Sequence, residues 1–213
     1  MNQPEPAGRQ FSTLMSDIEA GRIKIPQFQR DFVWTKDKSA KLLDSILKGF
    51  PVGTIILWKT KEQLRTVSNI GNAELPDTPA GDYAQQVLDG QQRLTSLYAS
   101  VKGLTVPRDG VTQDFSAMFV DLDAAGDSDV VVADIDGKPE KSYIRLADLL
   151  NADFTFLAGF PAKYHEKLKT YQDRLRSYSF SVIMVNDAPI DVATEIFTRI
   201  NVTGKPLSVF EIM

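Results

Sequence analysis

The sequence has no cysteine and a single histidine, His165. Without cysteine the chain cannot form disulfides, thiolate zinc sites or a catalytic thiol. One histidine excludes a two-histidine metal cluster and a His-Asn-His nuclease motif within these 213 residues. Long apolar runs are missing too, because the stretch from Thr54 to Trp58 is far shorter than the roughly 20 residues that cross a bilayer. The N-terminus has no cationic start followed by an apolar stretch, so we expect no signal peptide, no membrane partner and a cytoplasmic location.

Charge of both signs is present but unevenly placed, with 24 Lys and Arg against 28 Asp and Glu. Eight aspartates and no basic residue lie in the segment 109–137, and the remainder carries 24 basic against 20 acidic residues. The segment 161–178 is locally basic. The chain could therefore bind a polyanion through a local basic region despite its net charge of −4. The alternative is that these lysines form an ordinary solvated helix face.

The apolar pattern mixes helices with short strands. It predicts helices from Ser12 or Thr13 to Gly21, from Thr35 to Gly49, from Leu94 to Gly103, over 161–176 and over 189–200. Strands are expected at 23–25, 54–58, 86–88, 115–122, 130–135, 143–146 and 180–185, with a loop over 69–82. The helix over 189–200 should face inward with Val192, Ala193, Ile196, Phe197 and Ile200. Such a mixture indicates an α+β or α/β class. Since a helix opening at Ser208 stops at Met213, we expect a fragment of a longer protein.

The pattern predicts a strand that leads through Asp89 and Gly90 into a helix beginning with Gln91, Gln92 and Arg93. Unsatisfied backbone N–H groups at a helix start bind phosphate well, and glycine lets an anion approach the main chain. Arg93 can donate two hydrogen bonds to phosphate oxygens. Asp89 would repel a phosphate, and a divalent cation between the two would remove that repulsion. On these residues alone, an N-capping Asp89 with a solvated helix start is the simpler interpretation.

Two further polar clusters are candidates. The segment from Ile25 to Trp34 mixes aromatics with Gln29 and Arg30, which is common in functional loops, but a core-filling aromatic loop is an equal alternative. The segment 196–207 contains Arg199 and Asn201 around a helix end and a glycine loop. By itself this second cluster is adequately explained by a C-capping Asn and a turn glycine.

Four short sequence motifs, taken together, indicate a protein family more specifically than any one of them does. They are Ile25-Pro26-Gln27-Phe28-Gln29-Arg30 with Trp34, Pro51-Val52-Gly53, Asp89-Gly90-Gln91-Gln92-Arg93-Leu94-Thr95, and Phe197-Thr198-Arg199-Ile200-Asn201 with Gly204 and Pro206-Leu207-Ser208. In this order they resemble the N-terminal domain of GmrSD-type, modification-dependent (type IV) restriction enzymes. The resemblance spans about residues 10 to 213.

The resemblance implies a ParB/sulfiredoxin-like α+β core, with a small mixed sheet, flanking helices and a β-rich acidic insertion over about 105–160. It implies one nucleotide-hydrolysing, DNA-sensing domain over 1–213, truncated at its C-terminus. In that superfamily an Asp/Gly-x-x-Arg turn holds a phosphate at a helix N-terminus, which agrees with the interpretation of Asp89 to Arg93. The implied activity is hydrolysis of a nucleoside triphosphate with Mg²⁺ or another divalent cation.

The resemblance also implies partners. The hydrolysis would be coupled to sensing of modified, double-stranded phage DNA. DNA cleavage would belong to a C-terminal His-Asn-His domain, in the full-length protein or in a partner chain. A homodimer is left open.

Carried onto this sequence, the family roles place Asp89 as the metal-linked residue or as the group that positions the attacking water. Gln91 and Gln92 would align the water or the nucleotide, beside Gly90 in the nucleotide-binding turn. Arg93 would hold the phosphate charge that grows in the transition state.

Two outer pairs would complete the site. Gln29 and Arg30 would line the same pocket or relay DNA sensing to it. Arg199 and Asn201 would close its far wall. Two alternatives to the NTPase remain: a non-catalytic module that binds modified DNA and uses the pocket for a backbone phosphate, and a ParB-like nuclease that acts on DNA directly.

Overall fold

The chain forms two compact units in the computed structural model, which describes residues 3–27, 32–62, 64–108 and 110–200. Unit 1 comprises Met1–Phe32, Gly53–Gln92 and Ser179–Met213. Unit 2 comprises Val33–Val52 and Arg93–Tyr178. Within the described ranges, no helix has the length and apolar character needed to span a membrane.

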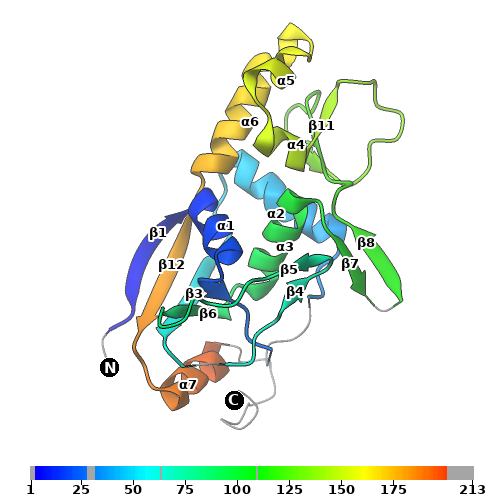
Figure 1. Ribbon diagram of the computed structural model, residues 1–213. Coiled ribbons are helices and arrows are strands. Elements are labelled where there is room, and N and C mark those ends of the chain that lie inside the picture. The colour runs from blue at the N-terminus through cyan, green and yellow to red at the C-terminus, as the bar shows by residue number, and fades with distance from the viewer. Residues whose placement is uncertain (1–2, 28–31, 63, 109, 201–213) are drawn as a thin grey trace. The chain divides into compact units, whose positions relative to one another are not determined.

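Unit 1 is built on a mixed five-stranded sheet with the strand order β1-β12-β3-β6-β2 (Figure 1). Its elements are β1 (Glu5–Gln10), α1 (Phe11–Glu19), β2 (Ile23–Lys24), β3 (Thr54–Thr60), β4 (Asn69–Ile70), β5 (Ala73–Glu74), β6 (Ala84–Asp89), the first residues of α3 (Gln91–Lys102), β12 (Ser179–Asn186) and α7 (Ile190–Ile200). β12 is parallel to β3 and β6 is parallel to β2, whereas β1 and β6 run antiparallel to β12 and β3.

The two faces of this sheet are covered by different helices, because side chains alternate along each strand. On one face, Phe11 of α1 packs against Phe180 of β12, with ring centroids 6.3 Å apart. On the other face, Trp58, Leu88 and Val185 form a buried cluster against which α7 packs. The Trp58 indole N–H donates to the carbonyl of Ala188 at 3.0 Å, so burial leaves no polar group of that ring unpaired.

Local sequence signals account for several element ends. Thr35 caps the N-terminus of α2 (Lys36–Lys48) by accepting from the Lys38 amide, and Gly49 ends the helix with φ +77°. α1 begins at Phe11 with Gln10 as its N-cap residue, so the expected cap at Ser12 or Thr13 is wrong by two or three residues.

Unit 2 combines helices with two small sheets. Its elements are α2, the rest of α3, β7 (Thr105–Arg108), β8 (Val111–Asp114), β9 (Phe119–Asp121), β10 (Val131–Val132), β11 (Tyr143–Arg145), α4 (Leu146–Asn151), α5 (Phe154–Ala158), the 3-10 helix η1 (Ala162–Tyr164) and α6 (His165–Ser177). β10, β9 and β11 form an antiparallel sheet, and β7 and β8 form a hairpin.

The acidic segment of unit 2 is fixed to α2 by one buried carboxylate. Asp44 of α2 accepts hydrogen bonds from the amides of Val130 and Val131 at 2.6 and 3.3 Å. Lys48, one turn further along α2, forms an ion pair with the same carboxylate at 2.8 Å. A backbone that would otherwise bury unpaired amides is therefore satisfied by a side chain.

The expected α+β class is confirmed as a mixed central sheet with flanking helices. The segment 69–82 is not simply a loop, because it contains the short β4–β5 hairpin turned at Gly71. The expected strand over 115–122 is only β9, and β1 and the β7–β8 hairpin were not anticipated. Ile200 is 39% exposed rather than inward-facing, since it lies at the last residue of α7.

We predict that Asp44→Ala lowers the free energy of unfolding by about 2–4 kcal/mol, because it leaves buried amides unpaired and Lys48 without its partner. The control is Asp129→Ala, which removes an exposed ion pair with Lys41 and should leave stability nearly unchanged. Urea denaturation of both variants and of the wild type measures the change in the free energy of unfolding. Equal losses would show that Asp44 does not anchor the acidic segment.

Candidate functional site

The turn from β6 into α3 is the structural feature closest to the sequence expectation. β6 ends at Asp89, α3 begins at Gln91, and the chain turns at Gly90 with φ +93°. That φ strains any residue with a Cβ, so glycine is required by the backbone. Gly90 and Gln91 are buried, whereas Asp89, Gln92 and Arg93 are partly exposed. A strand, a glycine and a helix start therefore occur as the sequence predicts, with polar side chains on both sides of the glycine.

A β-bulge lies directly before this turn. Across the β3–β6 pair, Asp89 faces Ile56 while Val87 faces Leu57, so the register shifts between Ile56 and Leu57. A bulge bends a strand and redirects the side chains that follow it, and bulges are frequent next to functional sites. In a regular strand Asp89 would lie on the same face of the sheet as Val87. Because of the register shift, it is instead in register with Ile56, the residue before the partner of Val87.

The second sequence cluster leaves the sheet at the same edge as Asp89. β2 is parallel to β6, with Lys24 in register with Gln86. Parallel strands end at the same edge of a sheet, and ligands of α/β proteins commonly bind outside such carboxyl ends. Beyond β2 the backbone N–H of Gln27 donates to the carbonyl of Arg65 at 2.9 Å, which fixes the start of this cluster. Gln29 and Arg30 lie outside the described residues.

Arg93 connects two of the sequence motifs within unit 2. Its guanidinium Nη1 donates to the carbonyl of Val52 at 3.2 Å. Val52 belongs to the Pro51-Val52-Gly53 string, which the sequence alone could not relate to Arg93. A guanidinium carries five N–H donors, so this carbonyl occupies one of them.

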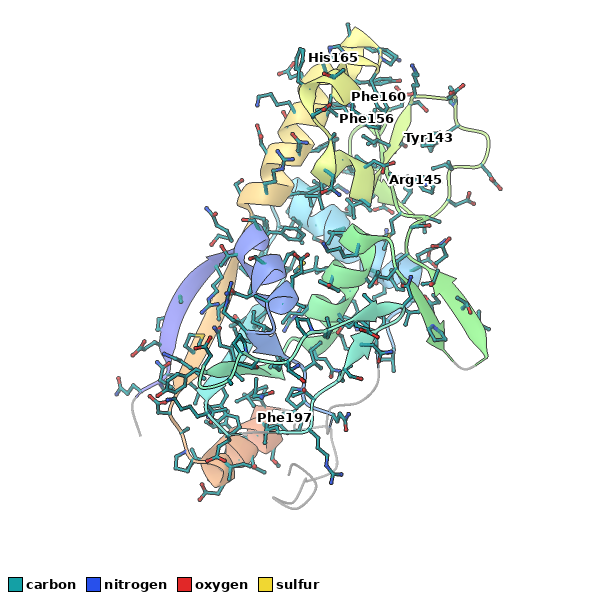
Figure 2. All side chains as sticks on the ribbon, viewed as in Figure 1. Tyr143, Arg145, Phe156, Phe160, His165 and Phe197 are labelled. Atoms are coloured by element: carbon teal, nitrogen blue, oxygen red, sulfur yellow. The ribbon has the colours of Figure 1, made fainter. Side chains whose placement is uncertain are left out.

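The third cluster begins on α7, which packs against the face of β6 that carries Leu88. Ile196 contacts the buried cluster of Trp58, Leu88 and Val185, and Phe197 lies next to it on the same helix (Figure 2). Arg199 is exposed and its guanidinium pairs with Glu195 one turn earlier, so the contact seen is within its own helix. Asn201 and the glycine loop after it lie outside the described residues.

The α7 face of the sheet carries two buried polar side chains, Lys24 and Gln86, that the sequence did not indicate. Lys24 is 5% exposed and donates to the carbonyl of Pro76 at 2.9 Å, and its strand neighbour Gln86 is 2% exposed. The signal was weak, because a lysine within Ile23-Lys24-Ile25 reads as the solvent-facing residue of an alternating strand.

The basic helix α6 uses its cations inside unit 2. Lys167 donates to the carbonyls of Leu122 and Ala124 at 2.8 and 3.0 Å. The other basic side chains of 161–178 are also engaged: Lys163 with Asp123, Lys169 with Asp173, Arg174 with the Leu47 carbonyl and Arg176 with the Leu150 carbonyl. All five basic side chains of this segment therefore have partners within unit 2. This weakens the interpretation of the segment as a surface that binds a polyanion.

His165 is the first residue of α6, which begins four residues later than the helix predicted over 161–176. It is exposed, and its Nε2 lies 2.7 Å from the Phe160 carbonyl oxygen (Figure 2). Over the ranges that the structure describes, no three histidine, aspartate or glutamate side chains gather in a geometry suited to a metal ion.

The fold and the turn define an α+β protein in which a strand of a mixed sheet passes through one glycine into a helix. The family model for the N-terminal domain of the GmrSD restriction endonuclease matches residues 11–213. The chain therefore belongs to this family, which confirms the resemblance seen in the sequence and places the chain in a family of restriction enzymes.

A curated relative is an uncharacterized protein, MJ0686, from Methanocaldococcus jannaschii. It is 27% identical over 232 residues, an alignment that covers 94% of this chain and 40% of the relative. The chain thus spans less than half the length of the curated relative that it matches.

We predict an acid-dependent loss of stability that originates at Asp123. The hydrogen bond from the Tyr164 hydroxyl, at 2.7 Å, lowers the pKa of the Asp123 carboxyl below its usual value, and Lys163 lowers this pKa further. Stability from a lowered pKa is fully present above the unfolded pKa, about 4, and is lost as the pH falls through the folded value. Asp123→Asn should therefore melt at a lower temperature than the wild type at pH 7, and this difference should begin to shrink near pH 4 and vanish once the pH is below the lowered pKa of Asp123.

The matched control is Asp127→Asn, which changes an exposed carboxyl of the same segment. It should keep the wild-type dependence of melting temperature on pH. If Asp123→Asn also keeps that dependence down to pH 2, the Tyr164 contact does not stabilise the ionised carboxyl.

Proposed function

We propose that this chain hydrolyses a nucleoside triphosphate with the help of a divalent cation, as the regulatory and sensor domain of a restriction protein that recognises modified phage DNA in the cytoplasm. The observation that carries the proposal is the turn at Gly90. It joins the end of β6 to the start of the twelve-residue helix α3, with Arg93 in the first helical turn.

The physical basis is the chemistry of a helix start. The first N–H groups of an α-helix have no intrahelical partner, and the helix dipole places partial positive charge there. A glycine at φ +93° also leaves no Cβ to obstruct an approaching phosphate. Arg93 adds a permanent charge whose planar donors match phosphate oxygens.

Hydrolysis requires charge stabilisation and a positioned water. Arg93 would neutralise the charge that develops on the phosphate oxygens in the transition state. Gln91 and Gln92 are neutral amides, so they would orient water or nucleotide by hydrogen bonding rather than accept its proton. Asp89, re-aimed by the bulge, would accept a hydrogen bond from the attacking water or hold the metal.

A divalent cation such as Mg²⁺ fits the donors at this turn. Mg²⁺ prefers oxygen ligands and is commonly bound through one or two carboxylates together with substrate phosphates and water. Asp89 is a partly exposed carboxylate at the strand end, so it supplies the required type of ligand. The cation would neutralise phosphate charge beside Arg93.

The remaining assignments follow from family membership. Gln29 and Arg30 would line the same pocket or relay DNA sensing to it, and Arg199 and Asn201 would close its far wall. The core would be ParB/sulfiredoxin-like. DNA cleavage would be carried out by a C-terminal His-Asn-His domain in the full-length protein or in a partner chain.

The test is phosphate release by the purified chain with ATP, GTP, CTP and UTP in the presence of Mg²⁺. We expect turnover of at least one nucleotide, and about a 100-fold or greater loss in Arg93→Ala, the range found when one transition-state donor is removed. Asp89→Ala should lose activity and its dependence on Mg²⁺ concentration. Turnover that is unchanged in both variants would rule out this turn as the site.

Gly90→Ala and Gly49→Ala form a matched pair that separates the site from fold stability. Both glycines have positive φ, +93° and +77°, so alanine should cost roughly 1–2 kcal/mol of stability at each. Only Gly90→Ala should lose phosphate release beyond what its melting temperature explains. Equal activity in the two variants would argue against phosphate approach at Gly90.

A further inference from the structure

Two lysines of unit 1 converge on one exposed tyrosine ring. The Nζ atoms of Lys59 and Lys61 lie 4.7 and 4.9 Å from the centroid of the Tyr83 ring. Lys61 is exposed, Lys59 is half-buried and Tyr83 is 38% exposed. Two positive charges are therefore held beside the same ring. We call Lys59 and Lys61 the lysine pair.

The pairing of β3 with β6 brings these residues together. The two strands are antiparallel, and Thr60 at the end of β3 is in register with Ala84 at the start of β6. Lys59 and Lys61 stand on either side of Thr60 in the sequence, and the ring residue, Tyr83, directly precedes β6. The lysine pair therefore lies at the edge of the sheet where β6 begins, whereas the turn into α3 lies where β6 ends. At about 3.3 Å per residue, the length of β6 separates the two places by roughly 20 Å.

The charges of the lysine pair are not used by the fold. Within the part of the chain that the structure describes, neither ammonium group forms an ion pair or donates a hydrogen bond, and their contacts are those with the Tyr83 ring. A lysine ammonium has three N–H donors, so a ring contact leaves donors available. The adjacent acidic residues Glu62 and Asp82 are exposed. They form no ion pair with either lysine among the described residues.

This arrangement differs from that of the basic helix of unit 2. There, each basic side chain of 161–178 binds a carbonyl or a carboxylate of the same unit. The lysine pair has no such internal partner among the described residues, so its two charges are available to an anion from outside the chain.

We propose that the lysine pair binds the phosphate backbone of duplex DNA. Lysine commonly contacts DNA phosphates, and such contacts position a protein on the duplex without reading its sequence. Each strand of B-DNA carries one phosphate charge per about 3.4 Å of helix axis, so two ammonium groups beside one ring can meet neighbouring phosphates of one strand. The inference rests on the DNA-sensing part of the proposed function and not on nucleotide hydrolysis. It places the DNA contact at the sheet edge opposite the turn at Gly90.

The experiment measures binding of a fluorescently labelled, unmodified DNA duplex of mixed sequence by anisotropy, from low to physiological salt. Lys59→Gln combined with Lys61→Gln should bind more weakly at low salt. It should also reduce the slope of log affinity against log salt concentration by about two, close to one for each lost phosphate contact. Arginine at both positions keeps the charges and should keep the wild-type slope.

The matched control is Lys163→Gln combined with Lys169→Gln, which removes two exposed charges from unit 2. Its salt slope should equal that of the wild type, and melting temperatures verify that both double variants are folded. A wild-type slope in the Lys59 and Lys61 double variant would overturn the inference, as would a wild type that does not bind the duplex at low salt. An equal reduction in both double variants would also overturn it, because total charge would then be the cause.

Nucleotide assays separate this inference from the proposed hydrolysis and from a free nucleotide as the source of phosphate. If the wild type hydrolyses no nucleotide while the Lys59 and Lys61 double variant loses DNA affinity as expected, hydrolysis is wrong and this inference stands. Without DNA, the double variant should bind the non-hydrolysable analogue of whichever nucleotide the wild type turns over as tightly as the wild type does. Weaker binding of that analogue with unchanged DNA binding would assign the lysine pair to the nucleotide and overturn the inference.

Discussion

The backbone at Gly90 is the constraint on which the candidate site depends. β6 is hydrogen-bonded on both sides, to β3 and to β2, so its end is held in place by the sheet. The helix that follows begins one residue after Gly90, and the chain makes this change of direction through a single left-handed residue. Sheet pairing thereby determines where the N-terminal amides of α3 are presented, and it does so next to the point where β2 also ends.

Several charged side chains of unit 2 bind the backbone of the unit itself and so stabilise its fold. In unit 2, Asp44 pairs with amides of the acidic segment 109–137, and Lys167 from the basic helix binds carbonyls in the middle of the same segment. These two residues lie far apart in the sequence, and both bind the backbone of this segment inside one unit. Net charge and a local basic stretch are therefore poor guides to a nucleic-acid partner here, because the cations that would contact a polyanion are the ones that hold backbone carbonyls.

Sequence reasoning succeeded where the determinants are local. Thr35 and Gly49 mark the ends of α2 because capping acts within one turn. It failed at β1, whose Pro6 and Gly8 disfavour a strand and whose partner β12 lies more than 160 residues away. The hairpin β7–β8 was missed for a similar reason, since Pro107 argues against a strand until its antiparallel partner is known.

The same distinction applies to the site. The order Asp89, Gly90 and Arg93 predicts a strand, a turn and a helix start, because each of these residues acts on its own neighbourhood. The approach of the β2 end toward the β6 end requires the strand order of the sheet, and the bond from Arg93 to Val52 requires the packing of unit 2. Motif strings can suggest that segments work together, but the physical reason for their proximity lies in topology.

The composition of α3 points to a cost that stability alone does not explain. A helix that is buried on nearly all sides is most stable with apolar side chains, yet α3 contains Thr95, Ser96 and Ser100 at buried positions without partners. Leu94 and Leu97 on the same helix are fully buried and apolar, as expected for such a helix. Natural proteins accept such local conflicts chiefly where function requires them. Among the described residues α3 buries three such hydroxyls and α2 buries one, that of Ser39, so the composition of α3 is not the one that stability alone would select.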